Sequence, residues 1–239
     1  MIREAIILAG GLGTRLRDAL PDLPKCMAPV NNIPFIDYVI SHLRKQGVEH
    51  FIFALGHRHE PITKHITDTY PDLKVSFSVE KEPLGTGGAI RLACSLATEK
   101  DVIVANGDTL YTIDANSLAS FHRQHHALCT LALKPMKDFD RYGVVETDKD
   151  GHIQSFLEKK PYQAGLINGG MYALHVPAFM SLELAEKCSF EKDFLEKYAG
   201  SEKLMGVPED AYFIDIGIPE DYKKAAVELP DRFPNIHTS

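Results

Sequence analysis

The sequence lacks several features that mark particular classes of protein. It contains no apolar run near the roughly 18 residues that a membrane span needs, no long block of Lys or Arg, and no Cys-x-x-Cys pair. Its 26 basic and 33 acidic residues give a formal charge of −7. We therefore expect no membrane partner and no nucleic acid bound through phosphate neutralisation. The four widely spaced cysteines fit neither a zinc site nor a disulfide framework, and they predict reduced thiols in a cytoplasmic protein.

What is present is the composition of an ordinary globular chain. Of its 239 residues, 44% are hydrophobic and 25% are charged, and no repeat or linker interrupts the chain. We expect one domain over residues 1–239, with a half at about 1–115 and a half at about 116–239 that share one sheet. Strand-like and helix-like segments alternate in the first half, which predicts an α/β fold whose mostly parallel sheet has helices on both faces. The strand-like segments of that half are 4–9, 48–55, 73–79 and 101–105, and the helical ones are about 35–43, 60–70 and 87–97.

The second half is less regular. We expect strands at 127–134, 143–147, 153–158 and 166–175, and helices near 191–198 and 219–228. Three turns follow strands of the first half, at 10–14, 80–88 and 106–108. Because ligands bind at the carboxyl ends of parallel strands, we expect these turns to lie along one edge of the sheet and to form the site.

The first of these turns has the residues of a phosphate-binding loop. Gly10, Gly11 and Gly13 directly follow a strand, so their backbone N–H groups can approach phosphates closely. Thr14 adds a hydroxyl group. The order is neither GxxxxGK[ST] nor GxGxxG, which argues against a P-loop and against a dinucleotide fold. An ordinary glycine-rich turn beside a surface arginine is the alternative.

Longer segments carry a resemblance to a known family. AGGLGTRL followed by LPKCMAPVNNIPFIDYVI resembles the signature of the sugar-1-phosphate nucleotidylyltransferases, and SVEKEPLGTGGAI, NGDT, RYGVV, EKK, INGG and YFIDIGIPEDY follow in that family's order. Within the family, EPLGTGGAI, LINGG, SFEKDFL and FIDIGIPEDY most resemble the D-glycero-α-D-manno-heptose-1-phosphate guanylyltransferases. The resemblance implies a Rossmann-like, GT-A-like α/β fold with a mixed, mostly parallel sheet. One departure is Cys26, where many relatives have proline.

The resemblance also implies a reaction and the residues that carry it. A sugar-1-phosphate oxygen attacks the α-phosphorus of a nucleoside triphosphate, and pyrophosphate leaves. Two mutually repelling anions then need cations, for which Arg15 and Lys25 are the candidates on the triphosphate. Asp108 and Asp215 are expected to hold Mg²⁺, which takes one or two carboxylates besides phosphates and water. These four form the expected catalytic set, although Asp215 could instead cap the helix that starts near residue 219.

The nucleotide half should also select the base. The residues expected to contact the nucleotide are Leu8, Gly10, Gly11, Gly13, Thr14, Glu80, Gly85 and Thr86. Guanine presents two adjacent donors, and a carboxylate such as that of Glu80 accepts both, which favours GTP. Glu82 is a rival for this role, and both could instead be solvated acids.

The sugar half is expected to contact the second substrate through Gly143, Glu158, Lys159 and Asn168. Lys159 is the candidate cation for the sugar phosphate, with a solvated surface lysine as the alternative. The heptose assignment rests on the resemblance alone. Mannose-1-phosphate with GTP, another sugar phosphate with UTP, and a regulatory homologue without catalysis stay open, as does a homodimer.

Overall fold

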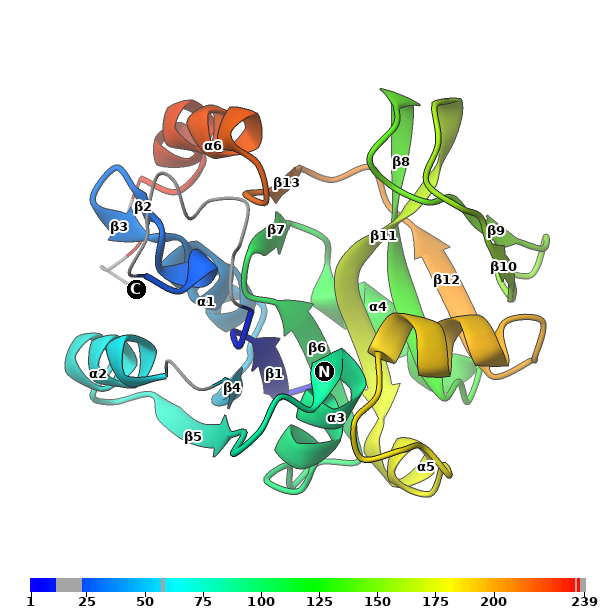
Figure 1. Ribbon diagram of the computed structural model, residues 1–239, viewed down its shortest axis with the longest axis horizontal. Coiled ribbons are helices and arrows are strands. Elements are labelled where there is room, and N and C mark those ends of the chain that lie inside the picture. The colour runs from blue at the N-terminus through cyan, green and yellow to red at the C-terminus, as the bar shows by residue number, and fades with distance from the viewer. Residues whose placement is uncertain (12–22, 57–58, 235, 237–239) are drawn as a thin grey trace.

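The computed structural model describes residues 1–11, 23–56, 59–234 and 236. Its main feature is a seven-stranded sheet in the order β12-β8-β11-β6-β1-β4-β5 (Figure 1). β11 is antiparallel to both of its neighbours, and every other adjacent pair is parallel. The predicted mixed, mostly parallel sheet is therefore confirmed, and strands from both halves of the sequence share it. Its strands are β1 (Glu4–Leu8), β4 (His50–Leu55), β5 (Lys74–Val79), β6 (Asp101–Asn106), β8 (Cys129–Phe139), β11 (Tyr162–His175) and β12 (Leu204–Pro208).

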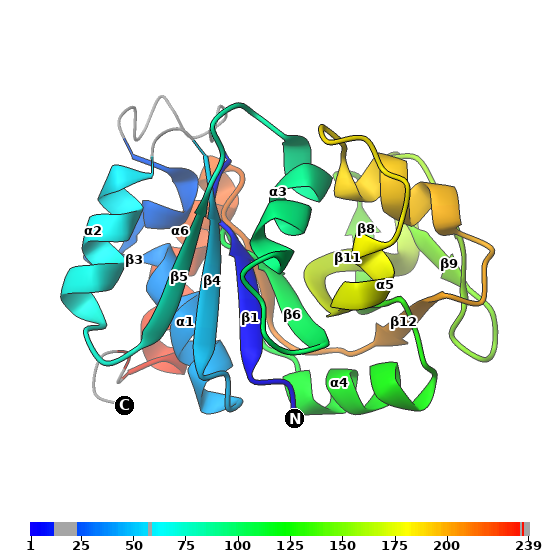
Figure 2. The same ribbon diagram turned by 90° about the horizontal axis from the view of Figure 1, so that it is seen from below.

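Helices cover both faces of this sheet (Figure 2). Successive side chains of a strand point to opposite faces, so Ile6 of β1 belongs to one buried cluster and Ile7 to the other. The cluster of Ile7 takes in residues of α1, α2, α4 and α6, and the cluster of Ile6 takes in residues of α3, α5 and a π-helix. The helices are α1 (Phe35–Lys45), α2 (Glu60–Thr69), α3 (Gly85–Cys94), α4 (Ala115–Gln124), α5 (Val176–Met180), the π-helix (Phe190–Glu196) and α6 (Pro219–Arg232). In the described part of the chain, none of them is both long and apolar enough to span a membrane.

Three two-stranded ribbons complete the fold. They pair β2 (Pro29–Val30) with β3 (Ile33–Pro34), β7 (Thr109–Tyr111) with β13 (Phe213–Asp215), and β9 (Val145–Thr147) with β10 (Ile153–Phe156). The β7–β13 ribbon matters most for function. It places Asp215 opposite Thr109, and the backbone N–H of Ile216 donates to the carbonyl of Asp108 at 3.1 Å. Two segments far apart in the sequence therefore lie side by side.

The second half differs from the sequence-based expectation in the lengths of two strands. β8 continues to Phe139 and β11 begins at Tyr162, whereas the expected strands covered 127–134 and 166–175. The added residues pair with each other, as in Phe139 with Tyr162. The two aromatic rings stack at a centroid distance of 5.6 Å. Pairing between distant segments thus overrides the local polarity and the proline at position 135.

The carboxyl ends of the parallel strands lie along one edge. At the end of β1, Leu8 accepts a hydrogen bond from the backbone N–H of Gly107, at 2.9 Å. At the end of β4, Leu55 accepts one from Glu80, also at 2.9 Å. Gly10 and Gly56 approach so closely that a Cβ on Gly10 would lie 2.9 Å from the nitrogen of Gly56. The described parts of the three predicted turns therefore share one edge of the sheet.

Candidate active site

Lys25 bridges the two predicted acids. Its ammonium nitrogen lies 2.5 Å from Oδ2 of Asp108 and 3.3 Å from Oδ1 of Asp215. The three side chains are 16%, 34% and 28% exposed, respectively, so solvent reaches the group only in part. The expected convergence of these acids and this lysine is present in the structure. Their catalytic and metal-binding roles stay predictions.

The chain positions this group through backbone contacts. Lys25 opens a short 3₁₀ turn, Lys25–Met27, just before β2. Asp108 follows β6, and Asp215 ends β13, which pairs with the strand that begins directly after Asp108. Oδ1 of Asp215 also accepts from the backbone N–H of Gly217 at 2.8 Å. A Cβ on Gly217 would lie 2.9 Å from that oxygen and 3.0 Å from the lysine nitrogen, so a glycine at this position keeps the group compact.

The donor set suits a hard divalent cation. Mg²⁺ prefers oxygen ligands and commonly takes one or two carboxylates, with phosphates and water in the remaining positions. Asp108 and Asp215 already share one cation, the Lys25 ammonium group, and both keep some exposure. Among the described residues no group of three or more His, Cys, Asp or Glu side chains is arranged to hold a metal ion. Two carboxylates leave the other coordination positions to phosphate oxygens and water, which suits a metal ion that would enter with a phosphate-bearing ligand.

Part of the glycine-rich turn lies outside the described residues. This applies to Gly13, Thr14 and Arg15, so their predicted roles are not placed in space. Leu8 ends β1 beside Asn106 of β6. Gly10 and Gly11 are exposed, and a Cβ on Gly11 would meet no atom of the described residues within 4 Å. Open space next to the backbone is what a phosphate group needs to approach it.

Glu80 is held in place at the mouth of the turn before α3. Its Oε2 accepts from the backbone N–H of Leu84 at 3.2 Å. Burial raises the pKa of this carboxyl group, and the hydrogen bond from Leu84 opposes that rise. Glu80 is half-buried, whereas Glu82 is exposed. Of the two rivals for the base, Glu80 is thus the one with a defined orientation.

The start of α3 is tied to the segment before the π-helix. Gly85 adopts φ +74°, and the backbone N–H groups of Gly87 and Gly88 donate to the carbonyl of Cys188, at 2.9 and 3.3 Å. The hydroxyl of Thr86 donates to Glu191 at 2.8 Å. The side chain of Thr86 therefore holds two elements together, and a contact with nucleotide would have to use other atoms of this residue or replace that bond.

The expected sugar residues lie on β11 and around the β9–β10 ribbon. Glu158 and Lys159 are exposed. A Cβ on Gly143 would lie 2.3 Å from the carbonyl oxygen of Leu157, so only glycine allows this approach. Asn168 uses its amide group to hold an irregularity in β11, because its oxygen accepts from Gly170 at 3.0 Å and its nitrogen donates to the Tyr172 hydroxyl at 2.9 Å. Its side chain is therefore already engaged.

Arg141 and Tyr142, which directly precede Gly143, have no role predicted from the sequence. The structure places the hydroxyl of Tyr142 3.5 Å from Oδ2 of Asp215, and it pairs Arg141 with Asp221. In the sequence, the one indication of a role for these two residues is their position directly before Gly143, which was expected to contact the sugar. Nothing in the local pattern indicates that this pair reaches residues 215 and 221.

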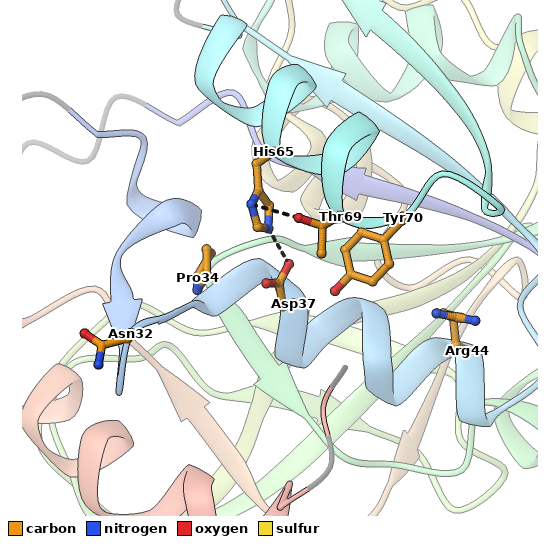
Figure 3. A pocket seen from close by; sticks show the side chains of 7 residues that line it. All are labelled: Asn32, Pro34, Asp37, Arg44, His65, Thr69 and Tyr70. Carbon is orange, nitrogen blue, oxygen red and sulfur yellow. Dashed lines mark hydrogen bonds and ion pairs between the residues drawn. The ribbon is translucent and has the colours of Figure 1, made fainter. Parts of the chain in front are cut away.

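A separate cavity of about 290 Å³ lies between α1 and α2 (Figure 3). In its lining, Oδ1 of the fully buried Asp37 lies 2.8 Å from Nε2 of His65, and Oγ1 of Thr69 lies 3.3 Å from Nδ1 of the same ring. Asn32, Pro34, Arg44 and Tyr70 complete its lining. Of the predicted site residues that the structure describes, none lines this cavity. Its carboxylate–imidazole contact joins the two helices.

The chain is similar to known proteins in sequence and in structure. A sequence model of the nucleotidyl transferase family matches residues 4–232. A D-glycero-α-D-manno-heptose 1-phosphate guanylyltransferase of Aneurinibacillus thermoaerophilus is 48% identical, over 95% of this chain and 98% of its own length. A protein of the same name from Campylobacter jejuni is 44% identical, over 92% of this chain and 96% of its own length. The crystal structure of HddC from Yersinia pseudotuberculosis complexed with GMP-PN superimposes with a TM-score of 0.86, at 37% identity, covering 95% of this chain and all of that one.

Proposed function

The chain belongs to the nucleotidyl transferase family, and we propose that it transfers GMP from GTP to D-glycero-α-D-manno-heptose 1-phosphate. The products are GDP-heptose and pyrophosphate. The observation that carries the chemistry is the convergence of Asp108, Asp215 and Lys25, with the segment of Asp108 bonded to the carboxyl end of β1 through Gly107 and Leu8. Support for the substrates comes from the two guanylyltransferases that match this chain over almost their whole lengths, and from the GMP-PN complex of the related HddC.

The reaction is an in-line displacement at phosphorus. A phosphate oxygen of the sugar-1-phosphate forms a bond to the α-phosphorus of GTP. The bond from that phosphorus to the oxygen bridging to the β-phosphate breaks, and pyrophosphate leaves with the electron pair. No covalent intermediate with the protein is needed, so the protein contributes position and charge.

The cationic side chains carry most of this work. Lys25 is close enough to the acids to be held in place, and we assign it and Arg15 to the triphosphate. Lys159, which is exposed, is assigned to the phosphate of the sugar. Together they offset the repulsion between the two substrates and the charge that develops on the leaving pyrophosphate.

A divalent cation, which we take to be Mg²⁺, would be held by the carboxylates of Asp108 and Asp215 and would supply additional positive charge at the phosphates. Lys25, which now pairs with both acids, would be the cation available to the triphosphate. The carboxylate pair thus serves in two ways, because it places the lysine and offers oxygen ligands.

Selection of the base is assigned to Glu80. A carboxylate matches the two adjacent donors of guanine, and the hydrogen bond from Leu84 orients this one. The sugar contacts are assigned to Gly143, Glu158 and Asn168. The side-chain amide of Asn168 would have to exchange a present bond, to Gly170 or to Tyr172, for one to the sugar. We also propose that the reaction takes place in the cytoplasm, in line with four free thiols. A homodimer stays a prediction that a measurement of mass in solution would test.

A matrix of substrates tests the proposal. Pyrophosphate release is measured with GTP, UTP, ATP and CTP, each with the 1-phosphates of the manno-heptose, mannose and glucose. The highest kcat/KM is expected for GTP with the heptose phosphate. Higher activity with mannose 1-phosphate would replace the sugar in the proposal, and equal use of UTP would remove the guanine assignment. Absence of release with every pair would leave a binding protein rather than an enzyme.

A further inference from the structure

The segment that joins β8 to β9 makes an ion pair with α6. Arg141, through Nη2, donates to the carboxylate of Asp221, and the two side chains are 39% and 23% exposed. Asp221 lies in the first turn of α6, where a negative charge interacts favourably with the helix dipole. The contact therefore links the segment before β9 to the helix that follows Asp215.

Tyr142 is enclosed by this pair and by β13. The guanidinium group of Arg141 lies 5.4 Å from the centroid of the Tyr142 ring. Phe213 packs against the same ring in an edge-on geometry, at 6.1 Å and 80°. These contacts restrain the ring so that its hydroxyl faces Oδ2 of Asp215 at 3.5 Å. The tyrosine hydroxyl carries an O–H group, so it can donate to this carboxylate oxygen.

The two oxygens of Asp215 consequently face different partners. Oδ1 accepts from the N–H of Gly217 and from the Lys25 ammonium group, and Oδ2 faces Tyr142. A carboxylate approached from both oxygens has little freedom to rotate about χ2. Tyr142 thus adds a restraint on the side opposite to Lys25.

The same segment reaches the sugar-phosphate region. Gly143 presses against the carbonyl of Leu157, and the N–H of Leu157 donates to the carbonyl of Val144 at 2.7 Å. Leu157 immediately precedes Glu158 and Lys159. Residues 141–144 therefore span from the acid pair to the segment assigned to the second substrate.

We propose that Arg141 and Asp221 form a clasp that holds Tyr142 against Asp215 and so sets the acid pair at the correct distance from the sugar-phosphate segment. The three are positioning residues, because they act through Asp215 and through the backbone of residues 143–158. This inference rests on the proposed transfer reaction. The inference adds Arg141, Tyr142 and Asp221 to the residues proposed for this reaction. It also gives a physical link between the acid pair and the sugar-phosphate segment.

A double-mutant cycle tests the clasp. Arg141→Gln, Asp221→Asn and the double variant are compared with wild type for kcat and KM, using GTP and the best sugar phosphate from the matrix. Each single variant is expected to lower kcat by about 10-fold, with less than about a 2-fold change in KM for GTP. The double variant should be no slower than the worse single variant, because all three break the same contact. Tyr142→Phe keeps the ring and should lower kcat in the same direction.

A second readout does not depend on turnover. Mn²⁺ binding in the presence of GTP, followed by electron paramagnetic resonance, should weaken by about 5-fold in Arg141→Gln and in Tyr142→Phe, because Asp215 loses its restraint. The matched control is Asp210→Asn, which breaks another ion pair, between Lys134 and the 81%-exposed Asp210. It should change neither readout. Melting temperatures show whether each variant is folded.

The outcomes separate this inference from the proposed function. If wild type releases no pyrophosphate from any pair, the proposed function fails. If wild type is active and the clasp variants behave like Asp210→Asn, the clasp is wrong. Additive losses in the double variant, or a raised KM for the sugar phosphate in Arg141→Gln alone, would mean that Arg141 contacts substrate directly, which also overturns the proposal.

Discussion

Replacing Lys25 by methionine should tighten the binding of a free divalent cation to Asp108 and Asp215, although the same change should slow catalysis. The Lys25 ammonium group now serves as the cation of the acid pair, at 2.5 and 3.3 Å. A metal ion that enters without nucleotide must displace it. Methionine keeps a side chain of similar length but leaves the two carboxylates without a positive partner.

The expected gain in metal affinity can be estimated from the strength of these two ion pairs. Two unit charges 4 Å apart interact by about 4 kcal/mol at an effective dielectric constant of about 20. The three side chains are between 16% and 34% exposed, so solvent screening and side-chain entropy reduce each contact to about 1 kcal/mol. Removing both contacts should therefore strengthen metal binding by about 2 kcal/mol, or about 30-fold.

The assay is Mn²⁺ binding to the protein without nucleotide, by electron paramagnetic resonance or calorimetry. The matched control is Lys64→Met, which removes an exposed lysine paired with Asp68 on α2 and should leave Mn²⁺ affinity unchanged. Turnover of Lys25→Met should fall by about 100-fold or more, because its charge is assigned to the triphosphate. An unchanged or weaker Mn²⁺ affinity in Lys25→Met would refute the reasoning that the lysine and the metal compete for the same carboxylates.

Three further changes have defined outcomes. Glu80→Gln should lower the ratio of kcat/KM for GTP to kcat/KM for UTP by about 100-fold. Glu82→Gln should leave this ratio unchanged. The reverse pattern would assign recognition of the base to Glu82. Gly217→Ala places a Cβ 2.9 Å from Oδ1 of Asp215 and should reduce pyrophosphate release by about 10-fold, with the melting temperature showing that the loss is local. Burial by itself would raise the pKa of Glu4, but hydrogen bonds from a neighbouring imidazole, a hydroxyl and two backbone N–H groups hold it at about 2. Because this folded-state pKa is depressed, the stabilisation is complete above about pH 5 and is lost as the pH falls toward 2, so urea unfolding of Glu4→Gln should show a flatter pH dependence there. An identical pH dependence in the two proteins would contradict this.

Local patterns predicted the parallel half of the fold well. The strands β1, β4, β5 and β6 and the helices α1 and α2 lie within a few residues of the expected positions. These elements depend on hydrophobic periodicity and on turn residues, which are properties of short segments. Gly47, which lies two residues after the end of α1, adopts φ +92°, a conformation that favours glycine.

Long-range pairing accounts for most of what local patterns missed. The added residues of β8 and β11 are strands because they pair with each other. By local sequence alone, β8 is not strand-like beyond residue 134, and β11 is not strand-like before residue 166. The short helix α5 was not expected, since five residues carry little periodic signal. The helix near Glu191 was expected, but its π geometry was not.

The candidate site divides in the same way. The convergence of Lys25, Asp108 and Asp215 was expected from a resemblance in motifs, and the β7–β13 pairing provides its physical cause. Nothing in the sequence shows that Arg141 pairs with Asp221 or that Tyr142 faces Asp215, because each contact joins residues from different parts of the chain. Such contacts can be identified only once the fold is known.

The most direct test of the central claim is the rate of pyrophosphate release by Asp108→Asn, Asp215→Asn and the double variant, with GTP and heptose 1-phosphate at saturation. Asparagine keeps the shape of each side chain and removes its charge. If the two carboxylates and Lys25 form one site for transfer, each single change should lower kcat by about 100-fold or more, and the double change should cost much less than the product of the two. Activity close to wild type in either single variant would contradict the account.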